Sequence, residues 1–572
     1  MRISLKQLGK QELKPYPGRW AQAWRIAALC ALATAMSMTY GIPEAVLSCY
    51  VLFFVMKSDA AETTIMALAL VVLVSLILAL LVGIVNLSID SPPMRFGILV
   101  LSSLVFMFLG VASLLGPLGG IIALVIAFLL TVLAYVPTGE IATRALMYAW
   151  LMVAAPMGLL VVCSLVFGRR PKHVLLAEMA RRLTLSAQYL EQSIAADALK
   201  EEVLAGIEAQ QKRAQWLKLF KLVPAGWQPW FDHAVVHSYG VLFTTYAQGA
   251  NLPEPYRLEL AQACKAAATS LQQAQRPSRF AFQHNYSPTV SAAACSIQHD
   301  LIQLAHTKHS TPIPKEKTAF FVDDAFTNPA YLRNAIQTTM AAVLCYLIYS
   351  AIDWAGIHTA LITCYIVGLS STGETIQKMI LRIIGCLVGV TLALLYLFVL
   401  VPHMSSIGSL MGVVFGVTLL AAWVVLGSER ISYAGLQIAF AFLLISLQGF
   451  GPSIDFDTAR DRVIGILLGN LMMYLFFSYL WPRSVCHVLD KRLQQIQQHV
   501  VKRSQSLQAD QSVAATYYAA VAATEWDNAQ FDYSMALLEP KNIRATPAQL
   551  QAYDRRLQQL WSQLKATAAG PS

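Results

Sequence analysis

Charged residues are scarce in this chain of 572 residues. They make up 13% of the sequence, whereas 56% of the residues are hydrophobic. A soluble domain ordinarily carries about 25% charged residues, so the composition excludes a soluble globular protein. The mean hydropathy of +0.54 agrees with this conclusion. The composition is that of an integral membrane protein.

Motifs for nucleotide hydrolysis and for common kinds of catalysis are absent. No GxxxxGK[ST] sequence occurs, which excludes ATP hydrolysis by the P-loop route. GxSxG and HExxH sequences are absent as well. We therefore expect no enzyme activity and no cofactor. Any active transport would have to draw on an ion gradient or on a partner protein.

Clustered cysteines are also absent. The nine cysteines form no CxxC pair, so we expect neither a disulfide framework nor a metal site. Six of them lie in apolar stretches, where cysteine behaves as a small hydrophobic residue. His233 and His237 are four residues apart on a predicted helix. Since no third ligand is in view, we predict that both histidines face solvent.

Two long hydrophobic blocks, 26–167 and 334–481, carry matching sequence. The first contains Ser48-Cys49-Tyr50-Val51 and Glu62-Thr63, and the second contains Thr363-Cys364-Tyr365-Ile366 and Glu374-Thr375. His173-Val174-Leu175 follows the first block and His487-Val488-Leu489 follows the second. Many transporters are built from a duplicated membrane module that repeats in the same direction. The repeat therefore predicts a transport path between the two halves.

Each block is expected to cross the membrane about six times, because a helical span needs about 20 apolar residues. The predicted spans of the first block are 26–42, 44–57, 64–87, 94–114, 117–136 and 146–167. Those of the second block are 334–351, 356–370, 376–401, 405–426, 430–449 and 463–481. The second span of each block is short, so five spans per block is the alternative.

Lysine and arginine outnumber aspartate and glutamate in all three polar segments, 1–25, 169–333 and 483–572. By the positive-inside rule these segments lie in the cytoplasm, together with both chain termini, and each block makes an even number of crossings. The excess of positive charge thus indicates orientation and attraction to the lipid bilayer rather than nucleic-acid binding.

The polar segments also read as helical. Residues 173–195, 197–222, 230–249, 254–275 and 286–309 are predicted helices, and 485–508 and 546–567 have the pattern of amphipathic helices. The latter two would pack on the central domain or on another copy of it, as in a homo-oligomer. We predict an all-α membrane protein with two repeated bundles of about six transmembrane helices, a helical cytoplasmic domain and a helical C-terminal tail. Its predicted parts are a basic N-terminus (1–25), a first membrane block (26–168), a cytoplasmic domain (169–333), a second membrane block (334–482) and a cytoplasmic tail (483–572).

Ionisable residues near membrane helices are the candidate functional residues, because burying them is costly. Glu374, Lys378 and Arg382 lie on one face of a predicted helix start. They could form an anion-attracting cytoplasmic entrance in which Glu374 exchanges protons. Alternatively, Ser371 and Glu374 form a capping box, while Lys378 and Arg382 extend to the lipid surface. Asp59 and Glu62 are the counterparts in the first block.

Further candidates lie at other helix ends. Glu429 and Arg430 begin the fifth span of the second block, and Gln437 follows about two turns later. Arg460, Asp461 and Arg462 precede the last span, and Arg144 has a comparable place in the first block. These residues could guide an anion outward. The alternative is structural pairing with acidic neighbours, such as Asp457 and Glu140.

Three sets of glycines recur at four-residue spacing on predicted membrane helices. The sets are Gly408, Gly412 and Gly416; Gly385 and Gly389; and Gly465 and Gly469. Small residues at this spacing allow helix backbones to approach closely in lipid. We therefore predict that all three sets lie at helix contacts; the alternative is that they line a substrate path.

Several motifs of the second half match a known family. They include Phe321-Val322-Asp323-Asp324-Ala325-Phe326, Glu429-Arg430-Ile431-Ser432-Tyr433-Ala434-Gly435, Gln448-Gly449-Phe450-Gly451-Pro452 and Arg460-Asp461-Arg462-Val463-Ile464-Gly465. In these motifs the chain resembles the fusaric acid resistance (FUSC), or aromatic acid exporter, family, and in particular its multidrug efflux branch. The resemblance implies an inner-membrane efflux subunit that works with a periplasmic adaptor and an outer-membrane channel. It also implies export of aromatic carboxylic acids or amphipathic drugs.

Three hypotheses follow from the sequence. The first is an exporter driven by an ion gradient, most plausibly of protons. The second is a passive organic-anion channel, because basic residues at both entrances would serve a pore equally well. The third is a membrane scaffold whose cytoplasmic helices bind partner proteins.

Overall fold

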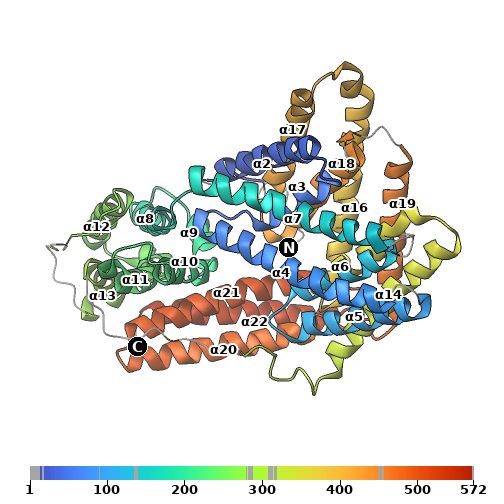
Figure 1. Ribbon diagram of the computed structural model, residues 1–572. Coiled ribbons are helices and arrows are strands. Elements are labelled where there is room, and N and C mark those ends of the chain that lie inside the picture. The colour runs from blue at the N-terminus through green and yellow to red at the C-terminus, as the bar shows by residue number, and fades with distance from the viewer. Residues whose placement is uncertain are drawn as a thin grey trace.

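The computed structural model describes residues 13–15, 18–88, 91–133, 139–278, 280, 282, 288–306, 314, 319–448, 451–452 and 456–569. Within these residues the chain is almost entirely helical, as predicted (Figure 1). Strands β1 (Leu447–Gln448) and β2 (Gly451–Pro452) pair in one antiparallel sheet.

Each predicted span overlaps one helix of the structure. The first block forms α2 (Arg19–Tyr40), α3 (Ala45–Val55), α4 (Ala60–Ser88), α5 (Pro92–Ala112), α6 (Pro117–Leu133) and α7 (Gly139–Phe167). The second block forms α14 (Pro329–Ala351), α15 (Thr359–Val367), α16 (Thr372–Leu395), α17 (Ile407–Val425), α18 (Glu429–Ser446) and α19 (Phe456–Tyr479). The 3-10 turn η3 (Ala355–His358) precedes α15, and η4 (Tyr396–Leu400) and η5 (Val401–His403) continue α16.

Six described helices are long and apolar enough to cross a bilayer, namely α4, α5, α7, α16 with its continuation, α17 and α19. Helices α3, α6, α15 and α18 are apolar but shorter, while α2 and α14 fall in neither group. The chain is therefore a multi-pass membrane protein. The arrangement of six crossings in each half remains a prediction.

Cysteine contacts repeat between the two halves. Cys49 Sγ in α3 lies 3.4 Å from the carbonyl oxygen of Cys30 in α2. Cys364 Sγ in α15 lies 3.7 Å from Cys345 Sγ in α14. The paired cysteines are 19 residues apart in both cases. The first two helices of each block thus meet at equivalent positions.

The third helix of each block also begins in the same way. An Asp59 Oδ1 atom accepts a hydrogen bond from the Glu62 N–H at 2.8 Å, where α4 begins. Ser371 Oγ accepts one from the Glu374 N–H at 3.3 Å, and Ser371 and Glu374 form the complete capping box at the start of α16. The predicted capping box is confirmed, and the sequence repeat is a repeat of local structure.

Helices of the first half pack against helices of the second half. Helix α2 packs along α17 of the other half, and α14 packs along α5. Likewise α3 contacts α18, and α15 contacts α6. As a result each of the two membrane cores contains residues from both blocks. Neither block could bury its apolar surface as completely alone.

The predicted glycine contacts are confirmed on two helices and wrong on a third. A Cβ on Gly389 would lie 2.6 Å from the Ile438 carbonyl oxygen, and one on Gly469 would lie 2.6 Å from the Ala360 carbonyl oxygen. A Cβ on Gly412 or Gly416 would meet nothing within 4 Å, and one on Gly408 only Ser406 Oγ at 3.8 Å. The α17 glycines therefore face open space rather than a neighbouring helix.

This difference predicts the effect of one added methyl group. Gly389→Ala should destabilise the protein by about 1–3 kcal/mol, because the methyl group would overlap backbone atoms of α18. Gly412→Ala is the matched control and should leave stability unchanged. Thermal unfolding of the two purified variants in detergent checks this. Equal unfolding temperatures would show that α16 and α18 are not in close contact.

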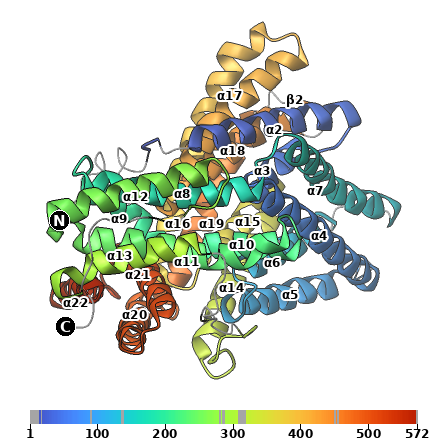
Figure 2. The same cartoon turned by 90° about the vertical axis from the view of Figure 1, so that its left-hand side faces the viewer.

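The remaining helices form a separate polar domain, which we define as α8–α13 together with α20–α22. Its helices are α8 (Pro171–Leu190), α9 (Ala196–Leu204), α10 (Glu208–Leu219), α11 (Gln228–Gln248), α12 (Glu254–Gln272), α13 (Pro288–Ala305), α20 (Cys486–Gln508), α21 (Ser512–Ala536) and α22 (Pro547–Ala566). Short 3-10 turns are η1 (Ala225–Trp227), η2 (Gly249–Asn251) and η6 (Thr567–Ala569). Figures 1 and 2 show this domain to one side of the membrane helices.

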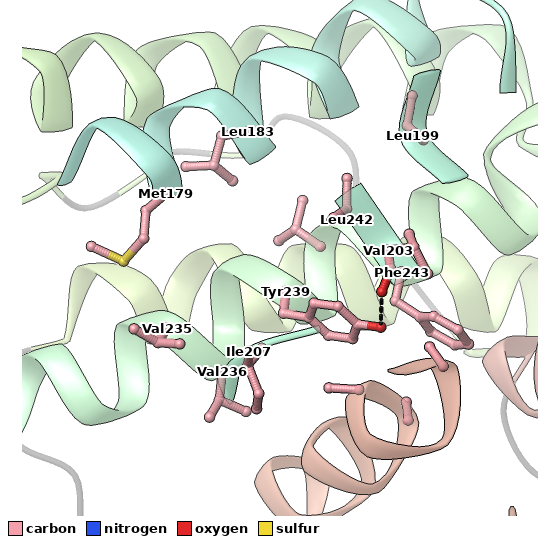
Figure 3. Packing of buried hydrophobic residues seen from close by; sticks show 14 of the residues in the cluster. Met179, Leu183, Leu199, Val203, Ile207, Val235, Val236, Tyr239, Leu242 and Phe243 are labelled. Atoms are coloured by element: carbon pink, nitrogen blue, oxygen red, sulfur yellow. Dashed lines mark hydrogen bonds between the residues drawn. The ribbon is translucent and has the colours of Figure 1, made fainter. Parts of the chain in front are cut away.

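One hydrophobic core joins the central segment to the C-terminal tail. Part of it is drawn in Figure 3, where the Tyr239 hydroxyl donates to the Val203 carbonyl oxygen at 2.9 Å. Helix α11 lies in the middle of the domain and contacts both α21 and α22. Of the two placements predicted for the tail, the structure thus shows packing on the central domain of the same chain.

Three predictions about the polar domain need correction. The predicted helix 197–222 is two helices, α9 and α10, because Gly206 between them has a φ of +63°. Helix α21 was not predicted, since its alanine-rich sequence has no apolar stripe. His233 and His237 are buried rather than facing solvent, and His237 Nδ1 lies 2.8 Å from an Asp300 carboxylate oxygen.

Candidate functional site

Arg382 is a fully buried cation in a membrane helix, with 0% of its surface exposed. Its Nε donates to Thr363 Oγ1 at 3.1 Å, and its Nη1 donates to Tyr433 Oη at 2.8 Å and to Gln437 Oε1 at 3.2 Å. Nη2 has no hydrogen-bond partner among the described residues. All three acceptors are neutral, so the charge of the guanidinium is not balanced by these contacts.

The sequence of α16 explains how this group is held. The capping box at Ser371 fixes where the helix begins, and Arg382 then lies about 12 Å along the axis from Glu374. Gly385 follows on the same side, where a Cβ would lie 2.6 Å from Gln437 Cβ. The glycine thus lets α18 approach closely enough for Gln437 to reach the guanidinium.

Aromatic and cationic groups surround Arg382. The Lys378 ammonium lies 5.2 Å from the centre of the Tyr433 ring. Tyr50, from α3 of the first block, interacts electrostatically with both Tyr433 and Arg382. Arg462 of α19 also interacts electrostatically with Arg382. We call Lys378, Arg382, Tyr433, Gln437, Arg462, Thr363 and Tyr50 the Arg382 cluster.

The predicted residues nearer the polar domain form no hydrogen bond with this cluster among the described residues, although Glu374 interacts electrostatically with Lys378. Glu374 Oε2 accepts from the Ser370 hydroxyl at 2.7 Å and from the Ser371 N–H at 3.2 Å. Arg430 interacts electrostatically with Asp527 of α21, at the boundary between membrane helices and polar domain. The backbone of Glu429 begins α18, but its side chain lies outside the described part of the structure.

At the other end of the site, Arg460 forms structural ion pairs. Its guanidinium contacts Asp457 and Asp461, both at 3.0 Å, and more than half of its side chain is exposed. Arg462 is less exposed than Arg460, being half-buried. It interacts electrostatically with Glu44, with Asp461 and with Arg382. Of these three predicted residues, only Arg462 joins the Arg382 cluster.

The candidate residues of the first block lie in structural positions outside the Arg382 cluster. Asp59 is buried and forms an ion pair with Arg213 of the polar domain at 2.9 Å. Glu62 lies in the first turn of α4. Arg144 pairs with Glu140 at 2.6 Å, with both side chains more than 70% exposed. None of these described contacts reaches the Arg382 cluster.

The two halves therefore differ at one position of their third helices, α4 and α16. Eight residues after Glu374 the second half has Arg382, whereas eight residues after Glu62 the first half has Leu70. Leu70 packs against a hydrophobic core. The start of the third helix is repeated, but at this position of that helix the second half has a buried cation and the first half has a leucine.

Sequence reasoning missed two contacts of the predicted site residues. Thr363 was part of the repeat motif but was not identified as a partner of Arg382, because their contact joins α15 to α16 across 19 residues. Arg213 was missed entirely, since its partner Asp59 lies 154 residues away. Among the described residues no group of three His, Cys, Asp or Glu is placed to hold a metal ion.

Comparison with known proteins agrees with the resemblance seen in the motifs. Residues 344–476 match the family described as fusaric acid resistance protein-like. The chain is 31% identical over 498 residues to the multidrug resistance protein MdtO of Escherichia coli O6:H1 (strain CFT073), covering 83% of this chain and 71% of the relative. It is 30% identical to the MdtO proteins of Escherichia coli K12 and Shigella flexneri, with the same coverage. No solved structure gives a significant match. By its identity and coverage, this chain belongs to the MdtO family of multidrug resistance membrane proteins, within the fusaric acid resistance protein-like group.

Proposed function

We propose that this protein is the inner-membrane subunit of an efflux system and that it exports aromatic carboxylic acids or amphipathic drugs. The observation that carries the proposal is Arg382, a fully buried cation whose described hydrogen-bond acceptors are all neutral. A charged side chain inside a membrane is costly and usually marks a substrate or ion pathway. Its Nη2 remains available for a ligand.

The chemistry around Arg382 favours an organic anion. A guanidinium keeps its positive charge and forms strong, charge-assisted hydrogen bonds with a carboxylate, and the N–H groups of Arg382 Nη2 have no other acceptor among the described residues. Arg462 and Lys378 add positive charge nearby, while Tyr50 and Tyr433 supply aromatic surface. A ligand with a carboxylate and an aromatic ring would satisfy both kinds of group.

The predicted path residues lie at three levels of the second half. Glu374 and Arg430 are nearest the polar domain, the Arg382 cluster follows along α16, and Arg460, Asp461 and Arg462 lie near the start of α19. We propose that an anion enters beside Glu374 and Arg430, binds at Arg382 and leaves past Arg462. The polar domain and both chain termini are cytoplasmic in this scheme.

The energy source and the partner proteins of the proposed transport are inferred from two features of the chain. The sequence has no P-loop, so we propose that the proton gradient drives export. The links from α4 to α5 and from α16 to α17 are short and cannot form a periplasmic domain. A separate periplasmic adaptor and an outer-membrane channel would then carry the substrate onward.

Efflux from cells loaded with benzoate, with and without a protonophore, tests the proposal. We expect export against the concentration gradient that stops when the proton gradient collapses. Export that continues unchanged would refute proton coupling. Flux that only follows the electrochemical potential of the anion would identify a passive channel. A scaffold would retain its phenotype in Glu374→Gln/Arg430→Gln and lose it on deletion of residues 172–310.

A further inference from the structure

The turn at the C-terminal end of α10 exposes large apolar side chains next to two lysines. Its sequence is Lys218-Leu219-Phe220-Lys221-Leu222, and all five residues are exposed. The exposed fractions are 67% for Leu219, 47% for Phe220 and 49% for Leu222. Neither lysine takes part in an ion pair among the described residues. Such a surface is unusual on a domain that is otherwise well packed.

The turn has a defined conformation. Lys221 is left-handed, with a φ of +50°, and the Leu222 N–H donates to the Leu217 carbonyl oxygen at 3.0 Å. This is the Schellman ending of a helix, in which the final residues fold back on the last turn. The rings of Trp216 and Phe220 stack with centroids 5.8 Å apart. The apolar side chains are therefore presented on a fixed backbone.

Contacts on both sides place the turn next to membrane helices. Before it, Arg213 of α10 bonds to Asp59 and Ser58, directly ahead of α4. After it, the Trp227 ring of η1 lies 3.9 Å from the ammonium of Lys172, five residues beyond the end of α7. Figure 2 shows α10 beside α4, and the two helices are in contact.

We propose that this turn, residues 218–222, inserts into the membrane leaflet that faces the polar domain and binds anionic phospholipid there. Leu219, Phe220 and Leu222 would enter the boundary between headgroups and acyl chains, as the apolar face of an interfacial helix does. Lys218 and Lys221 would contact phosphate groups. The sequence Arg169-Arg170-Pro171-Lys172, at the junction of α7 and α8, adds positive charge nearby. Basic residues beside a membrane span are typical of binding to acidic lipid.

Two features favour lipid over a protein partner. The turn adjoins the residues where α4 begins and α7 ends, so the bilayer is the nearest apolar medium. Its charge is entirely positive, which complements the acidic headgroups of the cytoplasmic leaflet. Contact with a second copy of the chain or with another protein is the competing outcome.

Photo-crosslinking of the full-length chain tests the proposal. The probe p-benzoylphenylalanine is introduced at position 220, or at position 219 if the first variant does not fold. The protein is placed in nanodiscs that contain phosphatidylcholine and phosphatidylglycerol. Leu258 of α12, with 44% exposure in the same domain, gives the control position. Mass spectrometry then counts lipid and protein adducts.

We expect at least about tenfold more lipid adduct at position 220 than at position 258, because α12 lies on the far side of the polar domain in Figure 1. Phosphatidylglycerol should be enriched about fivefold over its share of the lipid, and Lys218→Gln/Lys221→Gln should remove that enrichment. Equal labelling at the two positions, or adducts with protein in place of lipid, would overturn the proposal.

Discussion

Arg382→Ala is expected to abolish export of aromatic carboxylates while leaving the protein folded in the membrane. The substitution removes a fully buried arginine of a membrane helix whose described acceptors are neutral side chains, namely Thr363, Tyr433 and Gln437. In the proposed site Arg382 pairs with the carboxylate of the bound substrate. Removing one partner of such a buried charge pair costs about 2–5 kcal/mol. The initial rate of export should therefore fall at least about 30-fold.

Two further variants separate charge from geometry. Arg382→Lys keeps the charge, but an ammonium cannot bond to Thr363, Tyr433 and Gln437 and also offer the donors of Nη2 to the substrate, so it should recover only part of the rate. Arg144→Ala is the control, because Arg144 forms an exposed ion pair of little energetic value. Export by Arg144→Ala should equal that of the wild type. Wild-type export by Arg382→Ala would remove Arg382 from the substrate path.

Arg213→Ala is expected to loosen the attachment of the polar domain to the first membrane block. The guanidinium contacts Asp59 at 2.9 Å and Glu178 at 2.5 Å, and it donates to Ser58 at 3.0 Å. Its removal leaves a buried carboxylate at Asp59 and a partly buried one at Glu178. Breaking a buried ion pair from one side costs about 3–5 kcal/mol, which thermal unfolding in detergent would register as a lower midpoint.

Dependence on pH gives this prediction a second readout. Burial raises the pKa of Glu178, and the adjacent Arg213 opposes that rise. Without Arg213 the folded-state pKa of Glu178 moves further above its unfolded value. The folded protein then binds more protons than the unfolded one, so its stability falls as the pH rises. The defect of Arg213→Ala should thus be larger at pH 8 than at pH 5.

Lys212→Ala is the matched control for Arg213, because the neighbouring residue forms an ion pair in which both side chains are at least 66% exposed. We expect no measurable change in its unfolding midpoint. The double variant Asp59→Asn/Arg213→Gln should be more stable than Arg213→Gln alone, since it leaves one buried charge fewer. A midpoint for Arg213→Ala equal to that of Lys212→Ala would contradict the ionic link.

Much of the fold could be predicted because local sequence determines it. Apolar runs between Gly, Pro and charged residues locate the membrane helices, and the match between Cys49 and Cys364 aligns the two halves. The capping box at Ser371 and Glu374 was visible for the same reason. Helix α21 could not be predicted, because its alanine-rich sequence depends on tertiary packing rather than on an apolar stripe.

Contacts between residues that are far apart in the sequence could not be predicted in this way. Spacing places Glu374, Lys378 and Arg382 on one face of α16, but it does not show that Arg382 is fully buried rather than extended to the lipid surface. That outcome depends on Thr363 and Gln437, which other helices supply. The α17 glycines show the converse, because their spacing suggested a helix contact that the structure lacks.

Transport into everted membrane vesicles is the most direct test of an exporter built around Arg382. Vesicles with an acidic interior are given radiolabelled benzoate outside, and its internal concentration is followed over time. The wild type should concentrate benzoate in the interior, and collapse of the proton gradient should release it. Arg382→Gln, present at the same level in the membrane, should not accumulate it. Accumulation by Arg382→Gln equal to that of the wild type would contradict the account.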